Sequence, residues 1–442
     1  MNSRSIPAGR FLALTALLIF LAGLPAGSRA NDAAYSSALP IIMAPPGVLI
    51  VDDEESLRAA IEMANRAGQF PRIELTADIA LTAPLPALVN PRAGTAIIAG
   101  NGHTLDGNRV GSVLAVGADT RVEIERLEIT DGSGSGGGIS VYAGSNKWLE
   151  LTINNSTLSG NQAGAFVGGA IFSATYEGYI TTHISRSTIA FNSAPEGGGL
   201  SNQGSFYGHG QADAIIKNST FSANVSSGKG GAISNVDNNP FLLLGAVQDE
   251  WASGDPAPQG GIGGANIQLL YSTVSDNQAA QGSGIWNDVQ SNFQSTGSII
   301  AGNEESGRNC WQPIISRGHN LDGDGSCGLA EPTDLANGQA ALRPLALVPP
   351  GDTATHALGP DSEALDRIPA GEFGCDPASD TDQRGVVRPQ PVGGIPGKES
   401  WTFRALEPDV AVISLEHSQI SGRNTEGIWT YRLTVTVEPA AE

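Results

Sequence analysis

The chain has 442 residues, 57 of them glycine, and a formal net charge of −21. This acidic balance argues against nucleic acids and anionic membrane surfaces as partners. It favours solubility, cationic partners or weak Ca²⁺ binding, and a merely solvated acidic surface is the plain alternative explanation.

Residues 1–30 have the pattern of a secretory signal peptide. Arg4 and Arg10 precede an apolar run from Phe11 to Leu24, and residues 28–30 end in a small-x-small cleavage pattern. The apolar run is short for a membrane span, and no later run is long enough to cross a bilayer. We therefore expect an exported protein, secreted or at the cell surface (outer membrane or extracellular), with no membrane span in the mature chain.

The next segments are a flexible leader over residues 31–47 and a helix over residues 52–68. Apolar residues recur within that helix at i, i+3, i+4 and i+7, at Leu57, Ala60, Ile61 and Ala64. Acidic residues begin the segment and Gly68 ends it. A single helix with one apolar face is typical of a cap over the open end of a solenoid.

Two short signatures then recur along the chain. One has an aliphatic or aromatic residue followed three positions later by an asparagine, at Asn161, Asn192, Asn224, Asn277 and Asn303. The other is glycine-rich and ends in Ile139, Ile171, Leu200, Ile233 and Ile285. The asparagine spacing is 31 and then 32 residues, which indicates a solenoid, and the interval of 53 after Asn224 predicts an insertion over residues 237–264.

These repeats predict an all-β fold, a right-handed parallel β-helix over residues 48–405. Alternating segments such as Leu149, Leu151 and Ile153 are strand-like. We expect each asparagine to adopt the left-handed conformation that turns the chain, and the asparagines to form a hydrogen-bonded ladder. The glycines allow neighbouring backbones to approach closely.

The same residues carry two resemblances. Phe221–Asn224 and Gly230–Ile233 match the FxxN and GGAI signatures, so the repeats resemble those of polymorphic outer membrane proteins. Residues 56–61 resemble the CSLREA motif that opens many exported bacterial β-helix proteins, with Glu55 in place of the cysteine and Ala59 in place of the glutamate. These resemblances imply an exported, cell-surface β-helix of adhesin-like character, and they supply no catalytic residue.

Aromatic residues recur seven to nine positions after the glycine signature, at Trp148, Tyr179, Tyr207, Phe241 and Phe293. This spacing would stack the rings on one side of the solenoid. A row of rings suits the faces of pyranose sugars, and Trp148, Tyr179 and Tyr207 are the glycan-binding candidates. The alternative is that the rings only cover a corner of the core.

The cysteines predict one disulfide. Cys310 and Cys327 enclose 16 residues and lack the spacing of a zinc site, and an exported protein can form a disulfide between them. Cys375 remains unpaired. Residues 318–324, 356–366 and 382–390 resemble the closing segment of a choice-of-anchor Q domain, which we place over residues 310–390. Residues 406–442 form a short C-terminal β tail.

No catalytic constellation is evident. His103 sits among glycines, as a turn residue does. Asp322 and Asp324 resemble only part of a Ca²⁺ loop, so no cofactor or metal site is predicted. Several charged residues occupy no repeating position: Glu150, Glu177, Glu196, Asp213, Lys217 and Lys229. The sequence favours a structural, adhesive or glycan-binding protein with an extracellular glycan or cell-surface partner. The alternative is a polysaccharide lyase or glycoside hydrolase of the pectate-lyase-like β-helix class.

Overall fold

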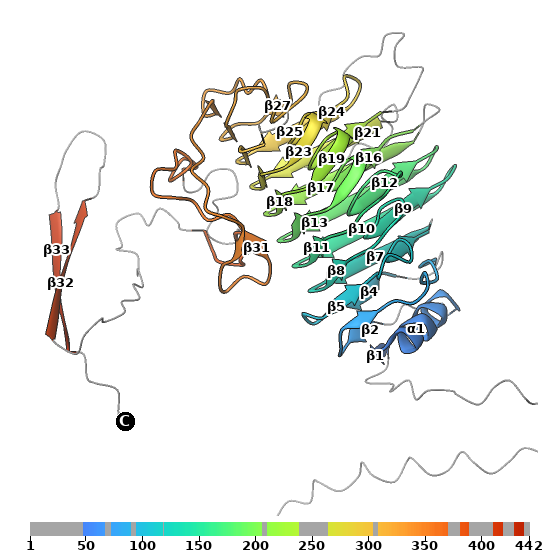
Figure 1. The fold of residues 1–442 in the computed structure, drawn as a ribbon. Coiled ribbons are helices and arrows are strands. Elements are labelled where there is room, and N and C mark those ends of the chain that lie inside the picture. Colours follow the sequence, from blue (N-terminus) through green and yellow to red (C-terminus); the bar gives the residue numbers. More distant parts are fainter. Residues whose placement is uncertain are drawn as a thin grey trace, which may run out of the picture. The chain divides into compact units, whose positions relative to one another are not determined.

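The computed structural model describes residues 47–66, 72–89, 94–117, 119–205, 210–237, 264–303, 308–369 and 381–388, together with the strands β32 and β33. The described chain is a right-handed parallel β-helix with an N-terminal helix, as the repeats predicted (Figure 1). The predicted signal peptide, most of the leader, residues 238–263 of the predicted insertion and Cys375 lie outside these residues.

Successive coils contribute strands to three long parallel sheets. The first sheet contains, in spatial order, β1 (Val48–Val51), β2 (Arg72–Leu75), β4 (Ala96–Ala99), β7 (Thr120–Glu125), β10 (Trp148–Asn154), β13 (Tyr179–Ser185), β17 (Gln211–Lys217), β21 (Gly264–Leu270), β25 (Asn292–Thr296) and β27 (Ile315–Ser316).

The second sheet contains β3 (Ile79–Ala80), β5 (Thr104–Asp106), β8 (Glu128–Thr130), β11 (Thr157–Ser159), β14 (Thr188–Ala190), β18 (Thr220–Ser222), β22 (Thr273–Ser275), β26 (Ile299–Ile300), β28 (Leu321–Asp322) and β29 (Leu335–Ala336). The third sheet contains β6 (Leu114–Val116), β9 (Ile139–Ala143), β12 (Ile171–Thr175), β16 (Leu200–Gln203), β20 (Ile233–Val236) and β24 (Ile285–Asn287). A short fourth sheet contains β15 (Ser193–Glu196), β19 (Val225–Lys229) and β23 (Gln278–Gln281).

The core is a column of inward side chains that follows from the period of two in each strand. In β10 the buried residues are Leu149, Leu151 and Ile153, which lie opposite Ile180, Thr182 and Ile184 of β13. Because the strands are parallel and in register, like positions stack from coil to coil. The alternation also fixes which side chains of the first sheet face outward.

The helix α1 (Glu54–Arg66) covers the N-terminal end of the solenoid (Figure 1). Its buried face contains Leu57, Ala60, Ile61 and Ala64, the residues that the periodicity predicted. The helix begins two residues later than expected, because Asp53 is its cap. Ser56 N donates to Asp53 Oδ1 at 2.8 Å, and Asp53 N donates back to Ser56 Oγ at 3.2 Å.

The turn before each recurring asparagine differs from the prediction in one respect. The left-handed residue is the one that precedes the asparagine, with positive φ at Gly160, Phe191, Ala223, Asp276 and Gly302. The asparagine itself is buried and keeps its amide for hydrogen bonds between coils. The turn is therefore made by a residue of variable type, and the asparagine stabilises it from inside.

The glycine signature has the close approach that was expected. The glycine that opens each turn has φ between +57° and +71°, as at Gly197 and Gly230. The glycine that follows has no room for a side chain: a Cβ on Gly231 would lie 2.2 Å from the carbonyl oxygen of Ser283 in the next coil. Only glycine fits this position.

After β29 the chain leaves the stack and runs back along the outer face of the second sheet. We call residues 343–369 and 381–388 the return segment; its strand β31 (Ala354–Thr355) is labelled in Figure 1. Within this segment, β31 pairs antiparallel with β30 (Ala346–Leu347). Gln383 is buried and donates to Thr188 Oγ1 and Ala354 O, while Thr220 Oγ1 donates to Gln383 Oε1 at 2.7 Å. The segment expected to close the solenoid thus also covers part of its side.

Residues 390–442 form a separate unit. Within it, β32 (Val410–Ser418) and β33 (Ile428–Thr436) pair antiparallel. Both strands lie within residues 406–442, where a short β tail was expected.

Candidate functional site: the outer face of the first sheet

Trp148 and Tyr179 lie side by side on the outer face of the first sheet. They are register partners at the starts of the adjacent strands β10 and β13. Their exposed fractions are 41% and 55%, so neither ring is part of the core. Adjacent strands are about 4.8 Å apart, which brings the two rings within reach of one ligand. Both rings are therefore accessible to a ligand, as a binding surface requires.

The row of rings does not extend as predicted. Phe293 is 1% exposed and pairs with Ile267, in the inner column that also contains Leu151, Thr182 and Ala214. The sequence spacing missed this because the coil that leads to β25 is shorter, which moves the ring to an inward position. Tyr207 and Phe241 lie outside the described residues.

Charged side chains border the two rings. Arg121 on β7 places its guanidinium carbon 5.5 Å from the centre of the Trp148 ring. Its Nε also donates to Glu150 Oε2 at 2.6 Å, across adjacent strands. The cation therefore joins the aromatic face to a carboxylate, and the surface combines a flat apolar patch with hydrogen-bonding groups at its edge.

A second outward column runs beside the rings, two residues further along each strand. It contains Arg121, Glu150, Thr181, Asp213 and Asn266 in register. The expectation that the charged residues occupy no repeating position is thus wrong for Glu150 and Asp213, which share this column with Thr181 between them. It is also wrong for Glu196 and Lys229, which are register partners on β15 and β19. The strand register reveals this column: Trp148 and Gln211 lie in the column of the rings, and Glu150 and Asp213 each follow two residues later.

Asp213 differs electrostatically from Glu150. Burial raises the pKa of the Asp213 carboxyl, against hydrogen bonds from Asn266 and Gln211 that lower it. Asn266 Nδ2 donates to Asp213 Oδ1 at 2.8 Å. Glu150 instead faces the Arg121 guanidinium. The column therefore holds one carboxyl that takes up a proton more readily than usual and one that is paired with a cation.

Two further tyrosines lie near Trp148 and Tyr179, and the sequence spacing did not select them. Tyr142, on β9, is 51% exposed, and Tyr176 follows β12 with 37% exposed. Each lies on the same coil as one of the two rings, a few residues before the strand of the first sheet begins. Exposed rings thus gather where the third sheet turns into the first.

The recurring asparagines form a continuous ladder inside the solenoid. Each side-chain Nδ2 donates to Oδ1 of the next asparagine at 2.9–3.0 Å, from Asn161 through Asn192, Asn224 and Asn277 to Asn303. The ladder continues beyond the predicted members, through Asn309 to Asp322. These residues have structural partners on both sides and are buried, so they belong to the scaffold.

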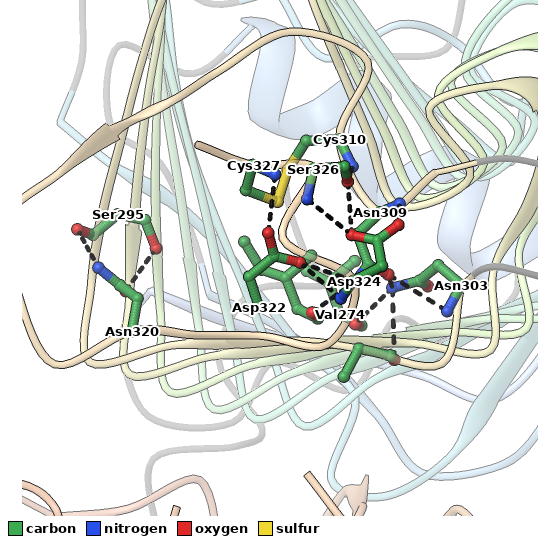
Figure 2. The surroundings of a disulfide bond; sticks show 12 residues. Val274, Ser295, Asn303, Asn309, Cys310, Asn320, Asp322, Asp324, Ser326 and Cys327 are labelled. Carbon is green, nitrogen blue, oxygen red and sulfur yellow. Dashed lines mark hydrogen bonds between the residues drawn. A yellow bond between two sulfur atoms is a disulfide. The ribbon is translucent and has the colours of Figure 1, made fainter. Parts of the chain in front are cut away.

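The ladder ends beside the disulfide between Cys310 and Cys327, which confirms the predicted pair (Figure 2). Cys327 N donates to Asp322 Oδ2 at 2.7 Å, and Ser326 Oγ donates to Asp324 Oδ1 at 2.6 Å. Burial raises the pKa of Asp322 to about 6, while hydrogen bonds from Ser326 and Asn309 outweigh burial and lower that of Asp324. The two carboxylates serve as acceptors for this loop.

A serine column, five residues before each ladder asparagine, was also missed. Its members are Ser156, Ser187, Ser219, Ser272 and Ser298, and the Oγ of each accepts a hydrogen bond from a backbone N–H of the preceding coil at 3.1–3.2 Å. The fixed spacing to the asparagine was visible in the sequence. It marks the turn between the first and second sheets.

The other chemical candidates have ordinary roles. His103 Nδ1 lies 3.2 Å from Asp78 Oδ1 in a turn between coils. Within the described ranges, no group of three or more His, Cys, Asp or Glu residues could hold a metal ion. In the same part of the chain, no helix has the length and hydropathy needed to span a bilayer.

Comparisons with protein-family models, with curated proteins and with solved structures returned no match to this chain.

Proposed function

We propose that this protein is an exported β-helix that binds extracellular glycans at the cell surface through Trp148 and Tyr179. The observation that carries the proposal is the placement of two exposed rings on adjacent strands, bordered by Arg121 and Glu150. Sugar rings present flat C–H faces that pack on aromatic rings, while their hydroxyl groups bond to charged side chains at the edge. Each ring contributes on the order of 1 kcal/mol, so binding gains strength from multivalent glycans.

Export and surface location rest on the sequence. The pattern of residues 1–30 is that of a signal peptide, and the CSLREA-like and polymorphic outer membrane protein-like signatures occur in exported surface proteins. The acidic composition suits an extracellular surface that does not bind nucleic acid. The rigid stack of coils provides a fixed platform for the rings.

The test is a glycan array probed with the mature protein, followed by titration of the best glycan. The Trp148→Ala/Tyr179→Ala variant should lose binding, with an unchanged circular dichroism spectrum, since both side chains are exposed. Phe166→Ala is the matched control, because this exposed ring lies in a turn elsewhere. Equal losses in the variant and the control, or no glycan bound by the wild type, would refute the proposal.

A second candidate function is glycoside hydrolysis on the same face. Glu150 and Asp213 lie two strands apart in one outward column, with roughly 10 Å between their backbones, and inverting glycosidases use such a pair of separated carboxyl groups. Asp213, with its raised pKa, would protonate the leaving oxygen, and Glu150 would activate water.

Assays for new reducing ends distinguish the two functions. If the protein is a hydrolase, Asp213→Asn should abolish product release and retain glycan binding. Under binding alone, no product appears with the wild type. Unsaturated product that forms only when Ca²⁺ is added would instead indicate a lyase.

A further inference from the structure

A cavity of about 410 Å³ lies between the second sheet and the return segment. Its walls include Tyr271, Ile299 and Leu335 from the solenoid, and Arg367, Asp382 and Arg388 from the return segment. The cavity is on a different sheet from Trp148 and Tyr179. Its volume is in the range of pockets that hold small organic ligands.

The solenoid wall of the cavity changes character along its length. The outward column of the second sheet carries Thr188, Thr220 and Thr273, and then Ile299, Leu321 and Leu335 in the following coils. The cavity spans this change, from Thr273 to Leu335. One part of the wall is therefore hydroxylic and the other part is aliphatic.

The return segment adds more positive than negative charge. Arg384 is neutralised by Asp382, with Nε and Nη2 donating to Asp382 Oδ2 at 2.8 and 2.5 Å. Arg388 and Arg367 line the same cavity, and no described carboxylate pairs with either. The lining thus carries an excess of positive charge in a chain whose net charge is −21.

Arg388 is fixed in place but incompletely paired. Its Nη2 donates to Asn218 Oδ1 at 2.9 Å, and its guanidinium carbon lies 5.1 Å from the centre of the Tyr271 ring. Its Nε is buried and has no hydrogen-bond partner. A buried N–H of a charged group without a partner is costly, and a carboxylate is the acceptor that matches a guanidinium best.

We propose that this cavity binds a small organic carboxylate with an apolar body. The carboxylate bonds to Arg388, assisted by Arg367 at the edge, and the apolar body packs on Ile299, Leu321 and Leu335. The aliphatic wall favours such a ligand over an inorganic anion, and the cations favour it over a neutral molecule of the same shape. The site is independent of glycan binding on the first sheet.

The test uses the full mature protein and calorimetric titration with butanoate, hexanoate and octanoate. Hexanol is the uncharged analogue, and inorganic phosphate is the anion without an apolar body. At least one carboxylate should bind saturably, one per chain, and at least roughly tenfold more tightly than hexanol or phosphate, the effect of one charge-assisted hydrogen bond.

Variants locate the site. Arg388→Gln should weaken carboxylate binding by roughly tenfold, and Ile299→Thr, which continues the threonine column, should weaken it less. Arg317→Gln is the control, since this exposed arginine bonds to Gln294 outside the cavity. Should Arg388→Gln fail to fold, the exposed Arg367→Gln replaces it. The proposal is overturned if no carboxylate binds, if phosphate binds as tightly, or if the control loses as much affinity as the cavity variants.

Discussion

The two ends of this solenoid are closed by different physical means. At the N-terminal end, α1 places the apolar side chains of Leu57, Ala60 and Ile61 over the open core. At the C-terminal end, a disulfide-closed loop follows the ladder. The return segment leaves from this end and bonds along the side of the second sheet, largely through polar groups such as Gln383 and Thr220. One end is stabilised mainly by burial of apolar surface, the other by a covalent link and a buried polar network.

The difference extends to the carboxylates at each end. Glu54 accepts hydrogen bonds from Thr82 N and Oγ1 and from Arg58, which outweigh burial and lower its pKa to about 2. Asp322 is buried below the disulfide, and its pKa is raised to about 6. The N-terminal carboxylate is thus stabilised in its charged form, and the C-terminal one in its protonated form.

The largest effect is expected for the apolar cap. Leu57→Ala removes a fully buried side chain between α1 and the first coils, and should lower the free energy of unfolding by about 3–4 kcal/mol. Urea denaturation of the variant measures this. Met63→Ala, on the exposed side of the same helix, should change stability by less than about 0.5 kcal/mol. Similar losses in both variants would mean that the buried face does not cap the core.

The disulfide should rank next. Replacing Cys310 and Cys327 with alanine opens a loop with a sequence separation of 17, which should cost about 3 kcal/mol through the entropy of the unfolded chain. The wild type should lose a similar amount on adding reductant, and the double variant should not respond to it. A reductant response in the double variant would refute the assignment of this stability to the pair.

The polar network of the return segment should have a smaller effect. Gln383→Ala leaves Thr188 and Thr220 without their buried partner and should cost about 2 kcal/mol. Limited proteolysis should then cut within residues 343–388 before the solenoid. Gln339→Ala is the control, because that side chain is exposed. Unchanged proteolysis in Gln383→Ala would show that other contacts hold the segment.

The sequence predicted the parts of the fold that repeat. Leu57, Ala60, Ile61 and Ala64 follow a helical period, and the ladder from Asn161 to Asn303 follows the coil length, so both could be found by counting. The left-handed turn residues could not, because Phe191, Ala223 and Gly302 share a conformation without sharing a side chain. Conformation at these positions is imposed by the stacking of the coils.

Contacts between residues far apart in the sequence could not be predicted, for a related reason. Asn218 donates to the carbonyl of Thr381, 163 residues away, and nothing in either local pattern indicates this contact. At the candidate site, Trp148 and Tyr179 were found by their spacing, but the placement of Asp213 beside them required the strand register. Phe293 was assigned to the outer face because the coil that leads to β25 is shorter than the others, so the same sequence spacing ends at an inward position.

The smallest predicted effect is a difference in pH response between the ends. The pKa of Glu54 is lower in the folded state than its usual 4.5, so its contribution is present above pH 4.5 and is lost as the pH falls toward 2. The pKa of Asp322 is higher than its usual 3.8, so its contribution is present below pH 3.8 and is lost as the pH rises to about 6.

Urea denaturation between pH 3 and pH 7 measures both contributions. The free energy of unfolding should rise less from pH 3 upward in Glu54→Gln than in the wild type, by about 1 kcal/mol. In Asp322→Asn, the decrease in the free energy of unfolding toward pH 6 should be smaller than in the wild type, also by about 1 kcal/mol. The two variants should therefore alter opposite slopes. If Asp322→Asn left the slope between pH 4 and pH 6 unchanged, its carboxylate would be ionised at the end of the ladder, and the contrast between the two ends would fail.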